Sequence, residues 1–152
     1  MIERLHHGEE ATAAEILALQ IPAYKVEASL IEFDGIPYLH ETVEIIKASD
    51  ETFIGFLTEG ELCGFLSYKE ENGAACIHRL AVHPGHFHEG IASKLITYFL
   101  EEESAGRTVR VTTGEKNEPA RSLYKKFGFV EVHVFSPEPG VELVLLEKNI
   151  NK

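Results

Sequence analysis

The sequence of 152 residues lacks any apolar run that approaches the roughly 18 residues of a membrane-spanning helix. Its start, Met1 to Arg4, shows no basic stretch followed by an apolar one, so we expect no signal peptide, no membrane partner and a cytoplasmic location. Cysteine is scarce too. The two thiols, Cys63 and Cys76, match no paired CxxC metal motif, and we expect them to be small buried side chains.

Positive charge is also in short supply. The chain carries 14 Lys and Arg against 25 Asp and Glu, a formal net charge of −11. This balance argues against a nucleic-acid partner, because proteins that bind the phosphate backbone need a basic surface. Residues 1–76 hold 4 basic and 15 acidic side chains, whereas residues 77–152 hold 10 of each. The acidic half is either a solvated surface that favours solubility or the acidic entrance of a binding site that attracts a cationic ligand.

Length and composition are those of one globular domain over residues 1–152, with 44% apolar and 26% charged residues. Helical spacing of apolar residues predicts helices over 9–20, 23–31, 38–48, 90–103 and 118–127, with Pro22 breaking the first from the second. Strand-like runs occupy 2–5, 53–57, 62–68, 75–82, 107–113, 129–135 and 141–147. The runs over 53–82 predict an antiparallel meander, and the whole order predicts an α/β (α+β) fold with a mixed sheet.

Two segments of the second half stand out by their spacing. Residues 80–95 read as strand, loop and helix, with Gly90 at the expected helix start, where unpaired N–H groups can hold a phosphate. Residues 117–129 read Asn-x-x-Ala-x-x-Leu-Tyr-x-x-x-Gly-Phe after a strand. This second segment resembles motif B of the GNAT superfamily, the acetyl-CoA-dependent N-acetyltransferases, and the first then resembles motif A. Element order and spacing agree with that family over about residues 52–148.

The resemblance implies a single-domain GNAT fold, with a mixed, mostly antiparallel sheet, helices on both faces and central strands that splay apart. Residues 1–50 would form helices on the acceptor side, and residues 52–148 would form the core that binds acetyl-CoA as cosubstrate. The residues that the resemblance places against this cosubstrate are Leu80, Ala81 and Val82 of the strand, Phe87, His88, Glu89, Gly90, Ile91, Ala92 and Ser93 of motif A, and Asn117 and Ala120 of motif B.

Motif A departs from the family pattern, which has Arg or Gln where this chain has Phe87 and often Gly and a basic residue in place of His88-Glu89. We therefore expect weaker or more pH-sensitive binding of acetyl-CoA, with His86 and His88 adding positive charge below about pH 6.5. No metal site is expected among His83, His86 and His88, because no Cys or reliably placed acid completes a ligand set.

By the same resemblance, Tyr124 is the general acid that protonates the departing thiolate, although an aromatic residue at helical spacing is otherwise typical of a core. An alkylamine with a pKa near 10.4 must lose a proton before it attacks. The sequence does not decide which residue is the general base. His78 is the first candidate, followed by an acid from the first half such as Glu27 or Glu41. Cys76 stands where the histone-acetylating branch carries its catalytic Glu, and a thiol is a poor base at neutral pH.

The sequence thus predicts an N-acetyltransferase that moves an acetyl group from acetyl-CoA to a primary amine. The acidic first half favours a cationic acceptor, namely a polyamine, an aminoglycoside-like molecule or a peptide amine, with Glu27 and Glu41 binding it. The alternatives are a non-catalytic GNAT-fold module that binds CoA or another ligand, and an enzyme that uses a longer acyl donor. The oligomeric state is open, with a homodimer among the options because dimers are frequent in the family.

Overall fold

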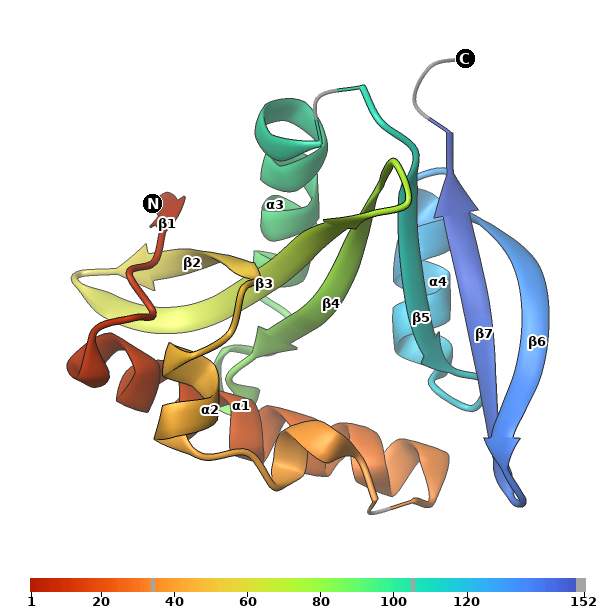
Figure 1. The fold of residues 1–152 in the computed structure, drawn as a ribbon, viewed down its shortest axis with the longest axis horizontal. Helices are drawn as coiled ribbons and strands as arrows, with labels where there is room; N and C mark the ends of the chain where they lie inside the picture. Colours follow the sequence, from red (N-terminus) through yellow and green to blue (C-terminus); the bar gives the residue numbers. More distant parts are fainter. Residues whose placement is uncertain (34, 105, 150–152) are drawn as a thin grey trace.

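The computed structural model describes residues 1–33, 35–104 and 106–149, and its centre is a seven-stranded sheet in the order β1-β2-β3-β4-β5-β7-β6 (Figure 1). The strands are β1 (Ile2–Arg4), β2 (Thr52–Thr58), β3 (Glu61–Glu71), β4 (Ala74–Val82), β5 (Val109–Gly114), β6 (Val130–Glu138) and β7 (Val141–Lys148). The helices are α1 (Glu10–Ile31), α2 (Val43–Lys47), α3 (Ile91–Tyr98) and α4 (Glu118–Lys126), with short turns η1 (Pro37–Leu39), η2 (Pro84–His86) and η3 (Phe99–Glu103).

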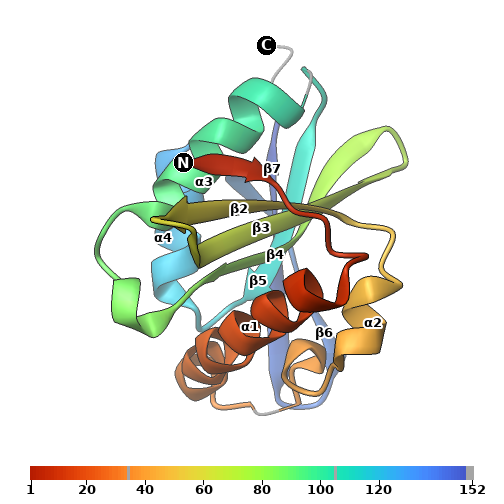
Figure 2. The same ribbon diagram turned by 90° about the vertical axis from the view of Figure 1, so that its left-hand side faces the viewer.

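The helices cover both faces of the sheet, as the two views show (Figures 1 and 2). On one face, α3 and α4 bury apolar side chains such as Leu95 and Tyr124 in a core with β3, β4, β5 and β7. On the other face, α1 and α2 bury Ile16 and Ile46 against Phe53 of β2 and its neighbours. Each helix therefore buries one apolar stripe against one face of the sheet, as amphipathic helices do. None of the described helices is long and apolar enough to cross a membrane.

The strands β2, β3 and β4 form the predicted antiparallel meander, but the pairing of β3 with β4 contains a bulge. Ser67 pairs with Arg79 and Tyr68 with Ile77, so His78 is the extra residue. A bulge reverses the alternation of side chains along a strand. As a result Leu80 joins Ile77 on the face of α3 and α4, while Arg79 turns toward α1.

The strands β4 and β5 separate after a short parallel contact. Their register begins at Ala75 with Val109 and ends at Ile77 with Val111, although β4 continues to Val82 and β5 to Gly114. On its other edge β5 stays bonded to β7 along its whole length, and β4 stays bonded to β3. Figure 1 shows the two strands diverging toward their C-terminal ends. The splayed centre expected of the fold is present.

Two expected helices differ from the structure. Pro22 neither ends nor restarts a helix, since α1 runs through it without interruption. A proline inside a helix removes one N–H donor, and the burial of side chains on both sides of it, including Leu19 and Tyr24, outweighs that loss. The range 38–48 is not one helix either. The turn η1 precedes a break, and Thr42 starts the short α2 by accepting a hydrogen bond from the N–H of Ile45 at 3.3 Å.

One buried ion cluster joins β4 to α1 and to the loop before β2. The guanidinium of Arg79, which is 3% exposed, donates to Glu51 Oε1 at 2.9 Å, to Gln20 Oε1 at 2.9 Å and to the carboxylate of Glu41. It also lies 4.6 Å from the ring centroid of Tyr38. Because a planar guanidinium offers five donors, one residue ties three separate segments to the strand beside the opening.

Substituting Arg79→Gln leaves the carboxylates of Glu41 and Glu51 half-buried without their cation. We expect the free energy of unfolding, measured by urea denaturation, to fall by about 3–5 kcal/mol. The matched control is Arg110→Gln, because the side chains of Arg110 and its partner Glu147 are about one-third exposed and such pairs contribute under about 1 kcal/mol. Equal, small losses in both variants would contradict a central role for the buried cluster.

Candidate active site

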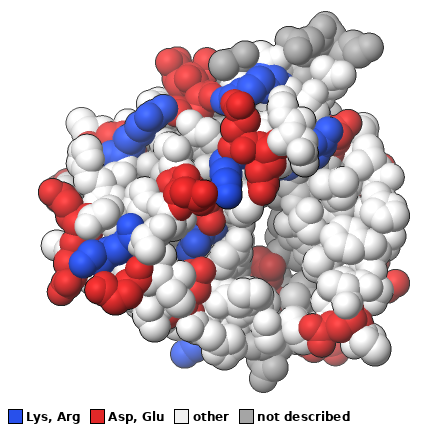
Figure 3. Space-filling model, viewed as in Figure 1, with Lys and Arg blue, Asp and Glu red and all other residues white. Residues whose placement is uncertain are grey.

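The divergence of β4 and β5 opens a cavity of about 460 Å³ that reaches α1, the loop before α3 and the start of α4. The space-filling view shows the surface hollowed between the halves of the molecule that carry these two strands (Figure 3). Of the positions predicted to hold the cosubstrate, Leu80, Ala81, Val82, Phe87, His88, Gly90, Ile91, Ala92, Ser93, Asn117 and Ala120 line it. Glu89 is not among the lining residues.

The loop that leads into α3 presents backbone donors to the cavity. His88 and Gly90 adopt left-handed conformations, with φ of 69° and 76°. Among the described residues, none accepts a hydrogen bond from the backbone N–H groups of residues 88–93. Gly90 tolerates the positive φ without cost, and the start of a helix carries partial positive charge. The loop therefore offers a set of open donors suited to an anion.

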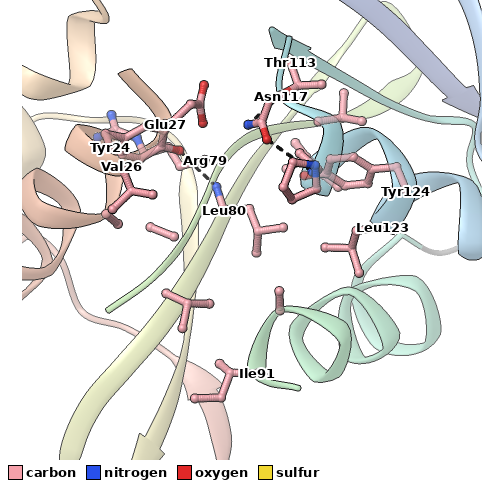
Figure 4. A pocket seen from close by; sticks show the side chains of 18 of the residues that line it. Tyr24, Val26, Glu27, Arg79, Leu80, Ile91, Thr113, Asn117, Leu123 and Tyr124 are labelled. Atoms are coloured by element: carbon pink, nitrogen blue, oxygen red, sulfur yellow. Dashed lines mark hydrogen bonds between the residues drawn. The ribbon is translucent and has the colours of Figure 1, made fainter. Parts of the chain in front are cut away.

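The edge of β4 that faces the cavity offers further donors. The N–H of His83 donates to the carbonyl of Cys63 in β3, so the backbone N–H groups at odd-numbered positions of this end of β4 point toward β3. The backbone N–H groups at even-numbered positions then point toward β5. The N–H of Leu80 follows this rule and donates to the hydroxyl of Tyr24 on α1 at 3.2 Å (Figure 4). Nothing in the sequence around Tyr24 singled it out, because it belongs to no motif and lies within a long helical pattern.

Asn117 begins α4 at the far wall of the cavity. Its Oδ1 accepts from the N–H of Ala120 at 3.3 Å, and its Nδ2 donates to Thr113 Oγ1 at 3.4 Å. Contact with the cosubstrate stays a prediction, and both ends of the amide stabilise the strand-to-helix connection. Asparagine is common at helix N-termini because its side-chain oxygen accepts a hydrogen bond from an N–H of the first turn.

Tyr124 projects from α4 into the same space (Figure 4). The side chain is 3% exposed and its ring packs 5.3 Å from that of Phe129. Among the described residues, none hydrogen bonds to its hydroxyl. Burial, with a smaller effect from the charge of Glu27, raises the pKa of Tyr124 far above its usual value. The phenol is therefore held neutral, as a proton donor must be.

Glu27 lies on α1 across the cavity from Tyr124 (Figure 4). It is the only acid among the described residues that line the cavity, and none of the described residues forms an ion pair or hydrogen bond with it. Burial raises the pKa of Glu27 from 4.5 to about 6. A carboxylate that is poorly solvated and unpaired holds a proton more strongly than an exposed one.

The other two candidate bases have different surroundings. His78 lines the cavity, and its Nε2 lies 3.0 Å from Glu71 Oε1. Glu41 does not line the cavity and instead accepts from Arg79 and Gln20. Further acids of the first half are paired with lysines on the surface: Glu32 with Lys116 at 3.1 Å and Glu44 with Lys47 at 3.6 Å. Asp34 falls outside the described residues. The structure thus brings Glu27, and not a broad set of acids, to the cavity.

The model of the acetyltransferase (GNAT) family matches residues 14–129. The chain belongs to this family. It is 42% identical over 143 residues to the UPF0157 protein YqkA of Bacillus subtilis (strain 168), a match that covers 94% of this chain and 42% of that relative. The chain therefore spans less than half the length of this relative.

Two solved GNAT structures share the fold. The ribosomal-protein-S18-alanine N-acetyltransferase of Escherichia coli has a TM-score of 0.77 at 16% identity, over 100% of this chain and 94% of that one. The PaiA N-acetyltransferase of Thermoplasma acidophilum, in complex with coenzyme A, has a TM-score of 0.74 at 17% identity, over 98% of each chain. The predicted family and fold are confirmed, and the family assignment supports acetyl-CoA as the cosubstrate.

The raised pKa of Glu27 has a consequence for stability. Above about pH 6 the folded protein holds the carboxylate ionised in an unfavourable site, whereas below about pH 4.5 the group is protonated in both folded and unfolded states. A shift from 4.5 to about 6 corresponds to about 2 kcal/mol at most, and partial exposure reduces it.

We therefore expect Glu27→Gln to raise the free energy of unfolding by about 1 kcal/mol at pH 7.5 and to lose this advantage by pH 4. Urea denaturation at both pH values measures the difference. Glu32→Gln serves as the control, because the side chain of Glu32 is 72% exposed and its pair with Lys116 contributes little. An advantage of Glu27→Gln that is equal at both pH values would contradict the assignment.

Proposed function

We propose that the protein transfers an acetyl group from acetyl-CoA to a primary amine in the cavity between β4 and β5. The observation that carries this proposal is the pair of Tyr124 and Glu27, which face each other across a cavity whose α3 end presents open N–H groups. A phenol and an unpaired carboxylate across one cavity are the acid and the base that aminolysis of a thioester requires.

The cosubstrate would lie along the opening from α3 to α4. The N–H groups of residues 88–93 would hold the diphosphate, and these donors are independent of side-chain identity. The edge of β4 near Leu80 and Val82 would pair with the amide groups of the pantetheine arm, as an added strand pairs with an open sheet edge. The absence of a basic residue at Phe87 affects only the side-chain contribution to this binding.

The acyl group would then reach the N–H of Leu80. This N–H points into the cavity and has the Tyr24 hydroxyl as its partner, so the two groups together mark a polar position on an otherwise apolar wall. A carbonyl oxygen placed there would accept from the hydroxyl of Tyr24, whose oxygen accepts from the N–H of Leu80. Donors aimed at the developing oxyanion lower the barrier of acyl transfer.

In the reaction, Glu27 removes a proton from the ammonium group of the acceptor, directly or through a water. The neutral amine attacks the thioester carbonyl, the new C–N bond forms, and the C–S bond breaks. The departing thiolate takes the phenolic proton of Tyr124. The nitrogen loses its second proton as the amide forms, and this proton restores the phenol, while the first proton passes from Glu27 to water. With its pKa of about 6, Glu27 is a stronger base than an ordinary carboxylate and is still ionised at neutral pH.

The acceptor side favours a primary ammonium group carried next to an apolar surface. Its described wall combines the single carboxylate of Glu27 with Val26, Leu30 and Ile36, and Val26 and Leu30 are 37% and 43% exposed. The E. coli structural relative is named for acetylating an alanine of a ribosomal protein. A polyamine, an aminoglycoside and a peptide amine all present the required ammonium group, and an assay with each would rank them.

The first test combines binding and turnover. Wild-type protein should bind acetyl-CoA at one site in calorimetry and should release CoA thiol when a cationic amine is added. Tyr124→Phe should lower kcat about 10²-fold, because the thiolate loses its proton donor, while the Kd for acetyl-CoA stays unchanged. Tyr98→Phe is the control, since Tyr98 belongs to α3 but does not line the cavity.

Binding without thiol release from any amine of the panel would overturn the enzymatic proposal and leave the non-catalytic module. A Tyr124→Phe variant with unchanged kcat would remove the acid role and assign this ring to packing against Phe129 alone.

The base is tested by pH. Wild-type kcat/KM should fall about tenfold per pH unit below pH 6, because protonated Glu27 cannot accept a proton. Glu27→Gln should lower kcat/KM about 10²-fold at pH 7.5 and abolish the inflection. His78→Gln should keep the wild-type inflection. The reverse pattern, in which only His78→Gln removes the inflection, would assign the base to His78.

A further inference from the structure

A second cluster of reactive side chains lies where β3 begins, and one of its three members, His86, also lines the cavity. One ligand atom each from Glu61, Cys63 and His86 lies within 4.8 Å of the other two. Glu61 and Cys63 come from the start of β3, and His86 ends the turn η2. From this geometry we propose a Zn²⁺ site formed by the Cys63 thiolate, a ring nitrogen of His86 and the carboxylate of Glu61.

The fold holds the three ligands near one another by backbone contacts. The N–H of His83 donates to the carbonyl of Cys63 at 2.9 Å, which fixes the end of β4 beside the start of β3. The N–H of His86 then donates to the carbonyl of His83 at 2.8 Å, and this turn carries the imidazole back toward β3. Cys63 is the extra residue of a bulge in the pairing of β2 with β3, because Phe56 pairs with Gly64 and Leu57 with Leu62. From this bulge its Sγ lies within 4.8 Å of a ligand atom of Glu61 and of His86.

The donor set is one that zinc prefers. Thiolate, imidazole and carboxylate are its three common protein ligands, and they bind at about 2.3, 2.0–2.1 and 2.0–2.2 Å. In tetrahedral geometry such ligand atoms lie about 3.4–3.6 Å apart, so the observed spacing closes around an ion by a shift of about 1 Å. Glu61 is exposed, and its side chain is free to make that shift. Water from the exposed side supplies the fourth position.

A neighbouring carboxylate already orients the imidazole. Nδ1 of His86 lies 3.1 Å from Glu89 Oε1. A carboxylate bonded to one ring nitrogen holds the proton there and leaves the lone pair on the other nitrogen for a metal. Glu89 is therefore a positioning residue in this site. The thiol of Cys63, which is 1% exposed, packs in the apolar core and donates a hydrogen bond to the carbonyl of Glu61 at 3.5 Å.

The sequence alone did not reveal this site. The histidines at positions 83, 86 and 88 were expected to lack a cysteine or an acid, but pairing of β3 with β4 brings both from more than twenty residues away. Binding converts the thiol to a thiolate and releases one proton per ion, so the ion replaces a neutral S–H group by a coordinated sulfur.

Cobalt substitution tests the site directly, because a Co²⁺–thiolate bond gives a charge-transfer absorption in the near ultraviolet. The full chain is freed of metal with a chelator and titrated with Co²⁺. We expect one equivalent of Co²⁺ to produce this band and one equivalent of Zn²⁺ to abolish it. Cys76→Ser is the matched control, since it removes the other cysteine and should leave the band unchanged.

Cys63→Ser should abolish the band, and chelator-treated Cys63→Ser should unfold at a temperature close to that of the chelator-treated wild type. His86→Gln provides a second variant in a half-buried turn where folding is not at risk, and it should weaken Co²⁺ binding at least tenfold. Glu89→Gln should weaken binding about 10-fold through the orientation of the ring. A band that depends on Cys76, or no thiolate band at one equivalent of Co²⁺, would overturn the proposal.

Discussion

The parting of β4 from β5 is the constraint on which the cavity depends. Each strand stays paired on its outer edge, β4 with β3 apart from the bulge at His78 and β5 with β7 along its whole length, and this allows the inner edges to remain open without loss of the sheet. An open inner edge is costly in a core because buried N–H and C=O groups need partners. Here the cavity leaves them accessible, and at Leu80 the hydroxyl of Tyr24 supplies a partner.

Acidic side chains have opposite surroundings at two places beside α1. Near Gln20 of α1, Arg79 neutralises Glu41 and Glu51, so these half-buried carboxylates are satisfied and contribute to fixing the strand. At the cavity, Glu27 has no such partner and its pKa rises to about 6. Structural acids are usually paired when buried, whereas groups that exchange protons are left unpaired in a poorly solvated place. This difference in pairing and in pKa distinguishes Glu27 from the other acids of the first half.

Periodicity and turn residues were enough to predict the strands, the meander and the helices after residue 50, because apolar runs, apolar helical stripes and turn residues are local signals in the sequence. The continuous α1 was missed since the local cost of Pro22 is smaller than the packing gained along the whole helix, and that packing is tertiary. The lining of the cavity by motif residues followed from the family pattern. The bond between Tyr24 and Leu80 and the proximity of His86 to Cys63 did not, because both join residues that are far apart in sequence.

The two departures from the family pattern in motif A, Phe87 and Glu89, do not affect the binding of a diphosphate equally. Phe87 lines the cavity, so the missing basic side chain is a real loss of charge beside the open N–H groups. Glu89 is different, because its carboxylate faces the ring of His86 and does not line the cavity. Its negative charge is thus directed at an imidazole and not at a bound diphosphate. The loop can therefore tolerate an acid at a position where the family often carries a base, since the donors that face the cavity belong to the backbone.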